Sequence, residues 1–350
     1  MKTIQFGNVP VGPGHLPYVI AEIGSNHNGD MDLCFQMIDA AAEAGAHAVK
    51  FQSWSERTLI AREEYERNTS YSDTKKHFGS LHEMVVKYQF TPEQHVEALG
   101  HCRKQGIAFS SSAFSMEEVD LLDELDVPFI KIASMDVNHF ELLTHAARKG
   151  RPLVISTGMA TLGEIEAALS VVRGQGNDKS VLLHCVSIYP PEEDAIHLRN
   201  IATLSSAFDV PVGFSDHTLG IAIPLASAAC GACVIEKHFT TDTDLPGWDH
   251  AISADPREMA EIVDGSRKVF RALGGHSRVV STAEVEKRKK MRRSLVTRRA
   301  LPAGHRIGEA DLDAKRPGTG IAPDEMRYIV GRRLTAAVGE DQVLAWSDFE

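Results

Sequence analysis

The sequence has few cysteines and no long apolar run. Cysteine occurs five times in 350 residues, at positions 34, 102, 185, 230 and 233. No stretch of about 18 consecutive apolar residues occurs, and the first ten residues, MKTIQFGNVP, do not resemble a secretion signal. An odd cysteine count without such a signal is typical of a reducing compartment. We therefore expect a soluble cytoplasmic protein that makes no membrane contact.

The sequence also lacks an excess of basic residues. It contains 48 acidic and 37 basic residues, which gives a formal net charge of -11. Nucleic acid is therefore not an expected partner. One basic run, EKRKKMRRS (286–294), interrupts this pattern, but acidic residues precede it. We interpret it as an exposed helix end followed by a linker.

A Cys-x-x-Cys pair is present without the other features of a metal or redox site. Cys230 and Cys233 lie in AACGACVIEKHF, and no second cysteine or histidine pair has zinc-binding spacing. We interpret both as small apolar side chains at the start of a strand.

Short apolar runs rich in β-branched residues recur along the first three quarters of the chain. They are continuous rather than alternating, which is typical of parallel strands buried on both faces. Helical patterns separate them. One such helix is expected to begin at Thr91-Pro92 and to end at Gly106. The eight runs cover residues 18–24, 48–52, 107–112, 129–134, 152–158, 181–187, 210–216 and 232–239.

Eight strand and helix alternations predict an α/β fold, a (β/α)₈ TIM barrel. A doubly wound open sheet is the alternative, but no glycine-rich dinucleotide motif follows the first strand. Towards the C-terminus, short strand-like runs are broken by proline and glycine. We therefore predict a barrel domain over 1–280, a linker over 281–293 and a small β-rich domain over 294–350.

Polar side chains gather where the predicted strands end, which is the face that carries TIM-barrel active sites. Each residue alone is weak evidence, but a lysine in an apolar run must be paired, and two such lysines occur. The strand-end residues are Glu22, Asn26, His27, Lys50, Gln52, Ser111, Ser112, Lys131, Ser134, Ser156, Thr157, Ser187, Tyr189, Ser215, His217, Glu236 and His238.

These residue types indicate a particular chemistry. Lys50, Lys131 and the serine hydroxyls, with no carboxylate among them, predict a site for an anion with phosphate and carboxylate groups. His217 and His238, on adjacent strands, can hold one divalent cation with open positions, which would polarise a carbonyl. Glu22 is placed to act as a base or to orient metal-bound water. Together they suggest carbon–carbon bond formation on an aldehyde.

The chain resembles the sialic acid synthase family in many ordered motifs. They are IAEIGSNHNGD, AEAGAHAVKFQ, IKIAS, STGMATLGEI, GFSDHTLG and IEKHFTTD…PGWDHAISADP. The tail, SLVTRRALPAGHRIGEADLDAKRPGTGI, resembles the antifreeze-like (SAF) domain of that family. The resemblance implies a transferase that condenses phosphoenolpyruvate with an N-acetylated hexosamine to a nine-carbon sugar acid. Phosphate would leave by C–O cleavage.

The resemblance also implies roles for individual residues. The metal, usually manganese, with magnesium or cobalt as alternatives, would be bound by His217 and His238. Glu22, Lys50 and Lys131 would be catalytic. Phosphoenolpyruvate would be bound by Lys50, Ser112, Lys131, Ser134, Ser156, Ser187 and Ser215, and the sugar by Gln52, Asp136, Tyr189, Asp249 and Arg316. The working unit would be a homodimer in which the small domain, with Arg316, covers the barrel of the partner.

Several departures from the family pattern concern the sugar. Asp136 stands where a glutamate is common, Ser187 where some members have asparagine, and SSSAF where Thr-Pro-Phe is common. A distinctive segment, 54–80, is expected to line the sugar pocket. N-Acetylmannosamine is the default substrate, and a 2,4-diacetamido-6-deoxy hexose or a phosphorylated hexosamine stays open. The alternative functions are a Schiff-base aldolase or lyase that uses Lys131, and an inactive carbohydrate-binding homologue.

Overall fold

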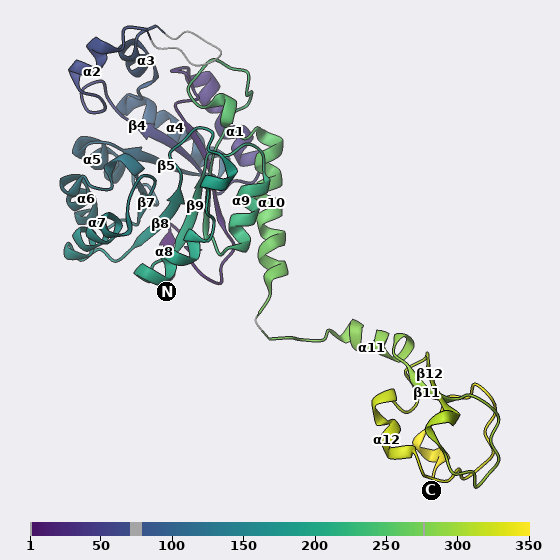
Figure 1. Cartoon of the computed structure of the whole chain (residues 1–350). Coiled ribbons are helices and arrows are strands. Elements are labelled where there is room, and N and C mark those ends of the chain that lie inside the picture. Colours follow the sequence, from purple (N-terminus) through teal and green to yellow (C-terminus); the bar gives the residue numbers. More distant parts are fainter. Residues whose placement is uncertain (1, 71–78, 276) are drawn as a thin grey trace. The chain divides into compact units, whose positions relative to one another are not determined.

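The computed structural model describes residues 2–70, 79–275 and 277–350. The chain divides into two compact units, Met1–Gly274 and Gly275–Glu350. Figure 1 shows the first unit as a ring of helices around a sheet. None of the described helices is both long and apolar enough to cross a membrane.

The first unit is a closed barrel of eight parallel strands, which confirms the predicted TIM barrel and excludes the open sheet. Each strand lies within or overlaps one of the eight predicted runs, and β10 pairs with β3 to close the sheet. Nearly all strand residues are buried, as expected for parallel strands covered on both faces. The strands are β3 (Tyr18–Gly24), β4 (Ala48–Ser53), β5 (Ala108–Ala113), β6 (Ile130–Ile132), β7 (Leu153–Ser156), β8 (Ser180–Cys185), β9 (Val212–Asp216) and β10 (Val234–His238).

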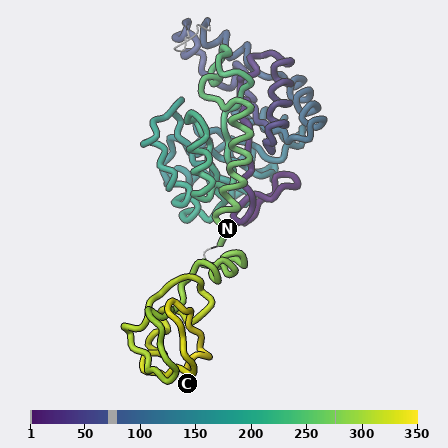
Figure 2. The backbone as a smooth tube through the Cα atoms, turned by 90° about the vertical axis from the view of Figure 1, so that its right-hand side faces the viewer, coloured from purple at the N-terminus to yellow at the C-terminus, as the bar shows by residue number. Residues whose placement is uncertain are grey.

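Helices follow the barrel strands along the chain and surround the barrel. They are α1 (Met31–Glu43), α4 (Pro92–Gln105), α5 (Met116–Glu124), α6 (Phe140–Arg148), α7 (Leu162–Gly174), α8 (Asn200–Phe208), α9 (Ala222–Ala229) and α10 (Pro256–Leu273). Helix α10 packs against both α9 and α1, and so completes the ring; Figure 2 shows it along the outside of the barrel. Two further helices, α2 (Arg62–Arg67) and α3 (Leu81–Tyr88), follow β4.

The start and end of α4 follow from local chemistry. The Thr91 hydroxyl accepts a hydrogen bond from the Gln94 amide, and the Gln94 side chain accepts one from the Thr91 amide. At the other end Gly106 has φ = 72°, a left-handed conformation that favours glycine. Both ends lie where Thr91-Pro92 and Gly106 predict them.

A short hairpin that the sequence analysis missed covers the N-terminal end of the barrel. It consists of β1 (Ile4–Phe6) and β2 (Val9–Val11), and these strands are too short to show a clear pattern. The Phe6 ring packs against Phe129 at 4.5 Å and against Tyr18 at 5.2 Å between ring centroids, beside the starts of β6 and β3. This end of the barrel is therefore filled with apolar side chains, and the opposite end is left for a site.

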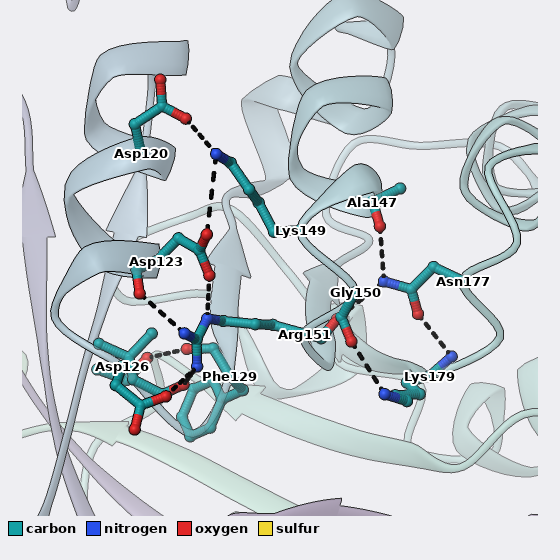
Figure 3. Close-up of polar contacts among 12 residues, drawn as sticks. Asp120, Asp123, Asp126, Phe129, Ala147, Lys149, Gly150, Arg151, Asn177 and Lys179 are labelled. Carbon is teal, nitrogen blue, oxygen red and sulfur yellow. Dashed lines mark hydrogen bonds and ion pairs between the residues drawn. The ribbon is translucent and has the colours of Figure 1, made fainter.

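Polar contacts fix the loops on the outside of the α5–β7 region, as Figure 3 shows. The Arg151 guanidinium donates to the carboxylates of Asp123 and Asp126 and to two backbone carbonyls. Lys149 pairs with Asp120 and Asp123. Asn177 donates to the Ala147 and Arg151 carbonyls. These contacts tie together the loops that precede β6, β7 and β8.

The second unit has its own small core. Strand β11 (Ser294–Thr297) pairs antiparallel with β12 (Leu312–Lys315), and α12 (Met326–Ile329) follows. The segment expected to be a linker contains α11 (Thr282–Met291), which has no buried residue, as its basic run predicts. The core residues are Leu295, Leu301, Ile307, Leu312, Ile321, Ile329, Leu334, Val338, Leu344 and Phe349.

Candidate active site

A cavity of about 440 Å³ opens at the C-terminal ends of the barrel strands. It is lined from every strand or the loop that follows it, where TIM-barrel active sites lie. The structure therefore brings most of the predicted site residues together. The predicted residues that line the cavity are Glu22, Lys50, Gln52, Ser112, Lys131, Ser134, Ser156, Ser187, Tyr189, Ser215, His217, Glu236 and His238.

Glu22 and Lys50 form a buried ion pair at the base of the cavity. They are neighbours in the register of β3 and β4, and Lys50 Nζ lies 2.6 Å from Glu22 Oε2. Lys50 Nζ also donates to Ser112 Oγ at 3.0 Å. Gln52, on the same face of β4, donates to Glu22 Oε1 at 3.1 Å. The carboxylate is thus held by two side chains from one neighbouring strand.

The expectation that no carboxylate lies among the lysines is wrong, because Glu236 contacts both. Glu236 oxygens lie 3.5 Å from Lys131 Nζ and 3.8 Å from Lys50 Nζ. Ser215 Oγ donates to Glu236 Oε1 at 2.9 Å. Glu236 lies in the middle of β10, the last barrel strand along the chain, and barrel closure places this strand beside the first barrel strand, β3. Burial requires each ammonium to be paired, and the two glutamates meet that requirement.

These four groups differ in how readily they ionise. Burial, together with the charge of Glu236, raises the pKa of Glu22 to about 7, although Lys50 partly opposes the shift. Burial opposes ionisation of Glu236 too, but Lys131 and Lys50 hold its pKa below the usual range. Burial lowers the pKa of Lys131, whereas Glu22 and Glu236 outweigh burial and raise that of Lys50. Near neutral pH a proton on Glu22 would leave the cluster with a net positive charge, which suits an anion.

Three serines converge on the loop after β7. The Gly158 amide donates to Ser134 Oγ at 3.1 Å. A Cβ at Gly158 would lie 2.2 Å from Ser187 Oγ, so only glycine allows this approach. Ser156 Oγ is buried and has no hydrogen-bond partner among the described residues. Hydroxyls and an amide from three strand ends thus face one region of the cavity.

His217 and His238 lie side by side above the charged groups. Their ring centroids are 5.4 Å apart, and the Tyr189 ring stacks on His217 at 4.1 Å. His217 Nδ1 donates to the Val186 carbonyl at 2.8 Å. Because a carbonyl only accepts, the proton of the neutral ring is on Nδ1 and Nε2 has a lone pair. Burial lowers the pKa of both histidines, most strongly that of His238, so both rings favour the neutral form.

Within the described ranges, no group of three or more histidine, cysteine, aspartate or glutamate side chains has the spacing of a metal site. Buried His238 Nδ1 has no hydrogen-bond partner there, and Asp249 Oδ2 is 3.7 Å away. Cys230 and Cys233 are free thiols.

The sequence matches known families over both units. The NeuB family model matches residues 37–278, and the SAF domain model matches residues 292–350. The chain belongs to the NeuB family. The predicted SAF domain is confirmed as well.

Relatives of this NeuB-family protein make several sugar acids. N,N'-diacetyllegionaminic acid synthase of Legionella pneumophila is 40% identical over 352 residues, 98% of each chain. N-acetylneuraminate-9-phosphate synthase of Homo sapiens is 36% identical over 95% of this chain and 93% of the human one. The crystal structure of N-acetylneuraminic acid synthetase from Leptospira borgpetersenii has 35% identity and a TM-score of 0.72, and it covers 82% of this chain and 95% of that one. The recognised resemblance to sialic acid synthases is confirmed.

One wall of the NeuB-family cavity is apolar, which the sequence analysis did not foresee. Trp54 packs edge-on against Trp248 and Phe114, at 5.9 and 6.2 Å between centroids. Leu59 and Ile60 complete this wall. These residues come from loops after β4, β5 and β10, and their order in the sequence shows no common pattern.

The distinctive segment 54–80 contributes to this wall, as expected, through Trp54, Leu59 and Ile60. Residues 71–78 of the segment lie outside the described residues. Glu118 on α5 accepts hydrogen bonds from Thr58 Oγ1 at 2.8 Å and from the Phe114 amide at 2.7 Å. This carboxylate fastens the segment to the end of β5.

Three predicted sugar-binding residues do not line the cavity. Asp136 lies in the turn after β6, with Oδ1 3.6 Å from His139 Nδ1. Asp249 lies behind His238, in a loop that Asn26 holds by donating to the Phe239 carbonyl and to Ser253 Oγ. The third, Arg316, is exposed on the second unit. Asn26 and His27 are buried and support this rim without lining the cavity.

The ionisation of Asp249 can be tested through stability. Burial raises its pKa to about 7, so between about pH 4 and pH 7 the folded protein holds a proton that the unfolded chain releases. In metal-free buffer, wild-type stability should therefore fall relative to Asp249→Asn as the pH rises from 5 to 8, by at most about 3 kcal/mol. Urea unfolding of both proteins from pH 5 to pH 8 measures this. A difference that does not change with pH would contradict the raised pKa.

Proposed function

We propose that this NeuB-family protein condenses phosphoenolpyruvate with an unphosphorylated N-acetylated amino sugar. The product would be a nine-carbon, sialic-acid-type sugar, and phosphate would leave by C–O cleavage. The observation that carries the proposal is the pair of buried lysines, Lys50 and Lys131, beneath an apolar wall at the open end of the barrel. The names of its relatives support the reaction class.

The charged base of the cavity suits phosphoenolpyruvate. Lys50 and Lys131 supply two ammonium groups, and Ser112, Ser134, Ser156, Ser187 and Ser215 supply hydroxyls around them. Charge-assisted hydrogen bonds of this kind are the strong ones for phosphate and carboxylate. Binding would replace the contacts that the two glutamates now make with the lysines.

A divalent metal fits the two imidazoles. A metal-binding histidine commonly donates its other ring N–H to a carbonyl, as His217 does to Val186. His238 Nδ1 is buried without a partner in the described part of the chain. We infer that His217 and His238 hold Mn²⁺, with Mg²⁺ or Co²⁺ as alternatives. When bound, the ion would act as a Lewis acid on the sugar aldehyde.

Glu22 is the best-placed proton carrier. In the proposed reaction C3 of phosphoenolpyruvate attacks the aldehyde carbon, water adds at C2, and the bridging oxygen leaves with phosphate. The aldehyde oxygen gains a proton and the water loses one. A carboxyl with a pKa of about 7 can both accept and donate near neutral pH. Gln52 keeps Glu22 oriented towards the cavity.

The apolar wall selects the kind of sugar. Trp54, Phe114 and Trp248 offer faces for acetyl and methyl groups. Among the described residues that line the cavity, the cations are Lys50 and Lys131, both at its base, so a second phosphate on the sugar would find no partner at the wall. We therefore favour a 2,4-diacetamido-6-deoxy hexose over N-acetylmannosamine or a phosphorylated hexosamine. The 40% identity to a diacetyllegionaminic acid synthase agrees with this choice. Gln52 and Tyr189, the two predicted sugar-binding residues of the barrel that line the cavity, would contact the sugar.

A Schiff-base mechanism is the second candidate, because burial lowers the pKa of Lys131 as that mechanism needs. It would need no metal, and borohydride would trap the substrate on the enzyme. An inactive, carbohydrate-binding homologue would show neither reaction.

The assay that separates these functions measures phosphate release from phosphoenolpyruvate with Mn²⁺ across a panel of amino sugars. We expect release that requires the sugar, is fastest with the 2,4-diacetamido-6-deoxy hexose, and falls at least 100-fold with EDTA.

His217→Ala should abolish turnover without unfolding the protein. The control, His145→Ala on the outer helix α6, should keep its turnover. EDTA-resistant turnover with borohydride trapping would favour the Schiff base, and silence across the panel would refute the proposed sugars.

We further propose that a second copy of the chain covers the cavity. Apolar side chains are exposed at this end of the barrel, on the segments that follow β6, β7, β8 and β9: Met135, Met159, Leu162 at the start of α7, Ile188 and Leu219. Exposed apolar side chains that gather at one end of a molecule are typical of an interface. In the resulting homodimer, Arg316 of the partner subunit would contact the sugar.

This arrangement predicts a selective kinetic effect. Arg316→Ala should raise the KM for the sugar about tenfold, because one charge-assisted contact is lost, and should leave the KM for phosphoenolpyruvate within about twofold. Steady-state kinetics with each substrate varied in turn provides the measurement. Arg327→Ala, another exposed arginine of the second unit, is the control. Equal effects on both KM values would argue against a contact between Arg316 and the sugar.

A further inference from the structure

A second buried ion pair lies on the other side of the barrel wall from the cavity. Side chains alternate along a strand, so the cavity-lining residues of β9 and β10 flank residues that point outwards. Asp216 lies between Ser215 and His217, and Lys237 lies between Glu236 and His238. Both residues of the pair are 1% exposed.

The two charged groups are joined to each other and to the loop after β9. Lys237 Nζ lies 2.8 Å from Asp216 Oδ2 and also donates to the Thr218 carbonyl. Asp216 Oδ1 accepts from the Thr218 amide at 3.0 Å and from its hydroxyl at 2.8 Å. The ion pair therefore includes Asp216, which precedes His217, and is hydrogen-bonded to Thr218, which follows it.

Each charged residue also precedes a candidate metal ligand in the sequence. Asp216 and Lys237 are partners in the β9–β10 register, and His217 and His238 follow them directly. A shift of either strand end would change the distance between the two imidazoles. The ion pair connects these two strand ends from behind the site.

We propose that the Asp216–Lys237 pair positions His217 and His238 for the metal, and thereby sets metal affinity. This inference rests on the proposed metal site. The two residues touch neither substrate nor metal, and act through the histidines that follow them.

The energetics of buried ion pairs support a geometric role. Removing two charges from water costs free energy that their attraction only roughly offsets, so well-packed apolar residues would stabilise a barrel wall as well or better. Groups that orient metal ligands typically change metal affinity by about 10- to 100-fold when they are replaced. The presence of an ion pair at this place is thus better explained by a role in positioning the two histidines than by a contribution to the stability of the fold.

The test is Mn²⁺ binding to the metal-free, full-length protein, measured by the electron paramagnetic resonance signal of free Mn²⁺. A single substitution would leave an unpaired buried charge, so the main variant is the neutral double Asp216→Asn/Lys237→Met, which keeps the shape and the Asn acceptor. We expect it to fold, by circular dichroism, and to bind Mn²⁺ at least tenfold more weakly. Its affinity for phosphoenolpyruvate without metal should stay within about twofold, which a collapsed pocket would not allow.

Two further variants make the result decisive. Thr218→Val keeps the ion pair and removes the hydrogen bond from the Thr218 hydroxyl to Asp216, so Mn²⁺ binding should weaken about threefold or more. If the double variant does not fold, this variant tests the inference in its place. Arg151→Met breaks the ion pairs near the opposite end of the barrel, shown in Figure 3, and should leave Mn²⁺ affinity unchanged.

The outcomes separate this inference from the proposed function. If the wild-type protein binds no Mn²⁺, the proposed metal site is wrong and this inference with it. If the wild type binds Mn²⁺ and the folded double variant, or Thr218→Val in its place, binds it equally well, the metal site stands and the positioning role is overturned.

Discussion

The site depends on how two buried lysines are paired. Lys50 and Lys131 can lie at the end of a barrel only because Glu22 and Glu236 lie within 2.6 to 3.8 Å of their ammonium groups. An unpaired ammonium there would cost several kcal/mol and would lose its proton. The same glutamates pair with the two ammonium groups at the cavity, where an anion can reach them. The same four charged side chains are therefore involved both in the stability of the folded barrel and in the binding of an anion.

Barrel closure is what assembles this set. The four charged groups come from β3, β4, β6 and β10, which span most of the first unit in sequence. Pairing of β10 with β3 brings Glu236 beside Glu22 and Lys50, and the apolar hairpin fills the other end. The Asp216–Lys237 pair works on the outer side of the same wall. Alternate side chains of β9 and β10 thus face the cavity, and the residues between them, Asp216 and Lys237, connect the two strands on the outer side.

Much of this could be predicted from the sequence, for a physical reason. Continuous apolar runs identify parallel strands, and each strand end shows which polar residues reach the rim; His217 and His238 were found in this way. Contacts between segments that are distant in the sequence produce no pattern from which they could be predicted. Glu236 between the lysines depends on closure, the wall of Trp54, Phe114 and Trp248 on three separate loops, and the hairpin at Phe6 on strands of three residues each.

The most direct test of this account is the affinity of the metal-free protein for phosphoenolpyruvate, measured by titration calorimetry in wild type and Lys131→Met. The variant keeps Glu236 paired with Ser215 and near Lys50, so it should fold. The account predicts that affinity falls by about 100-fold, because a charge-assisted contact of about 1.5 to 3 kcal/mol is lost and the cavity base has one positive charge fewer. Unchanged affinity would show that phosphoenolpyruvate does not bind at the paired lysines, and would contradict the central claim.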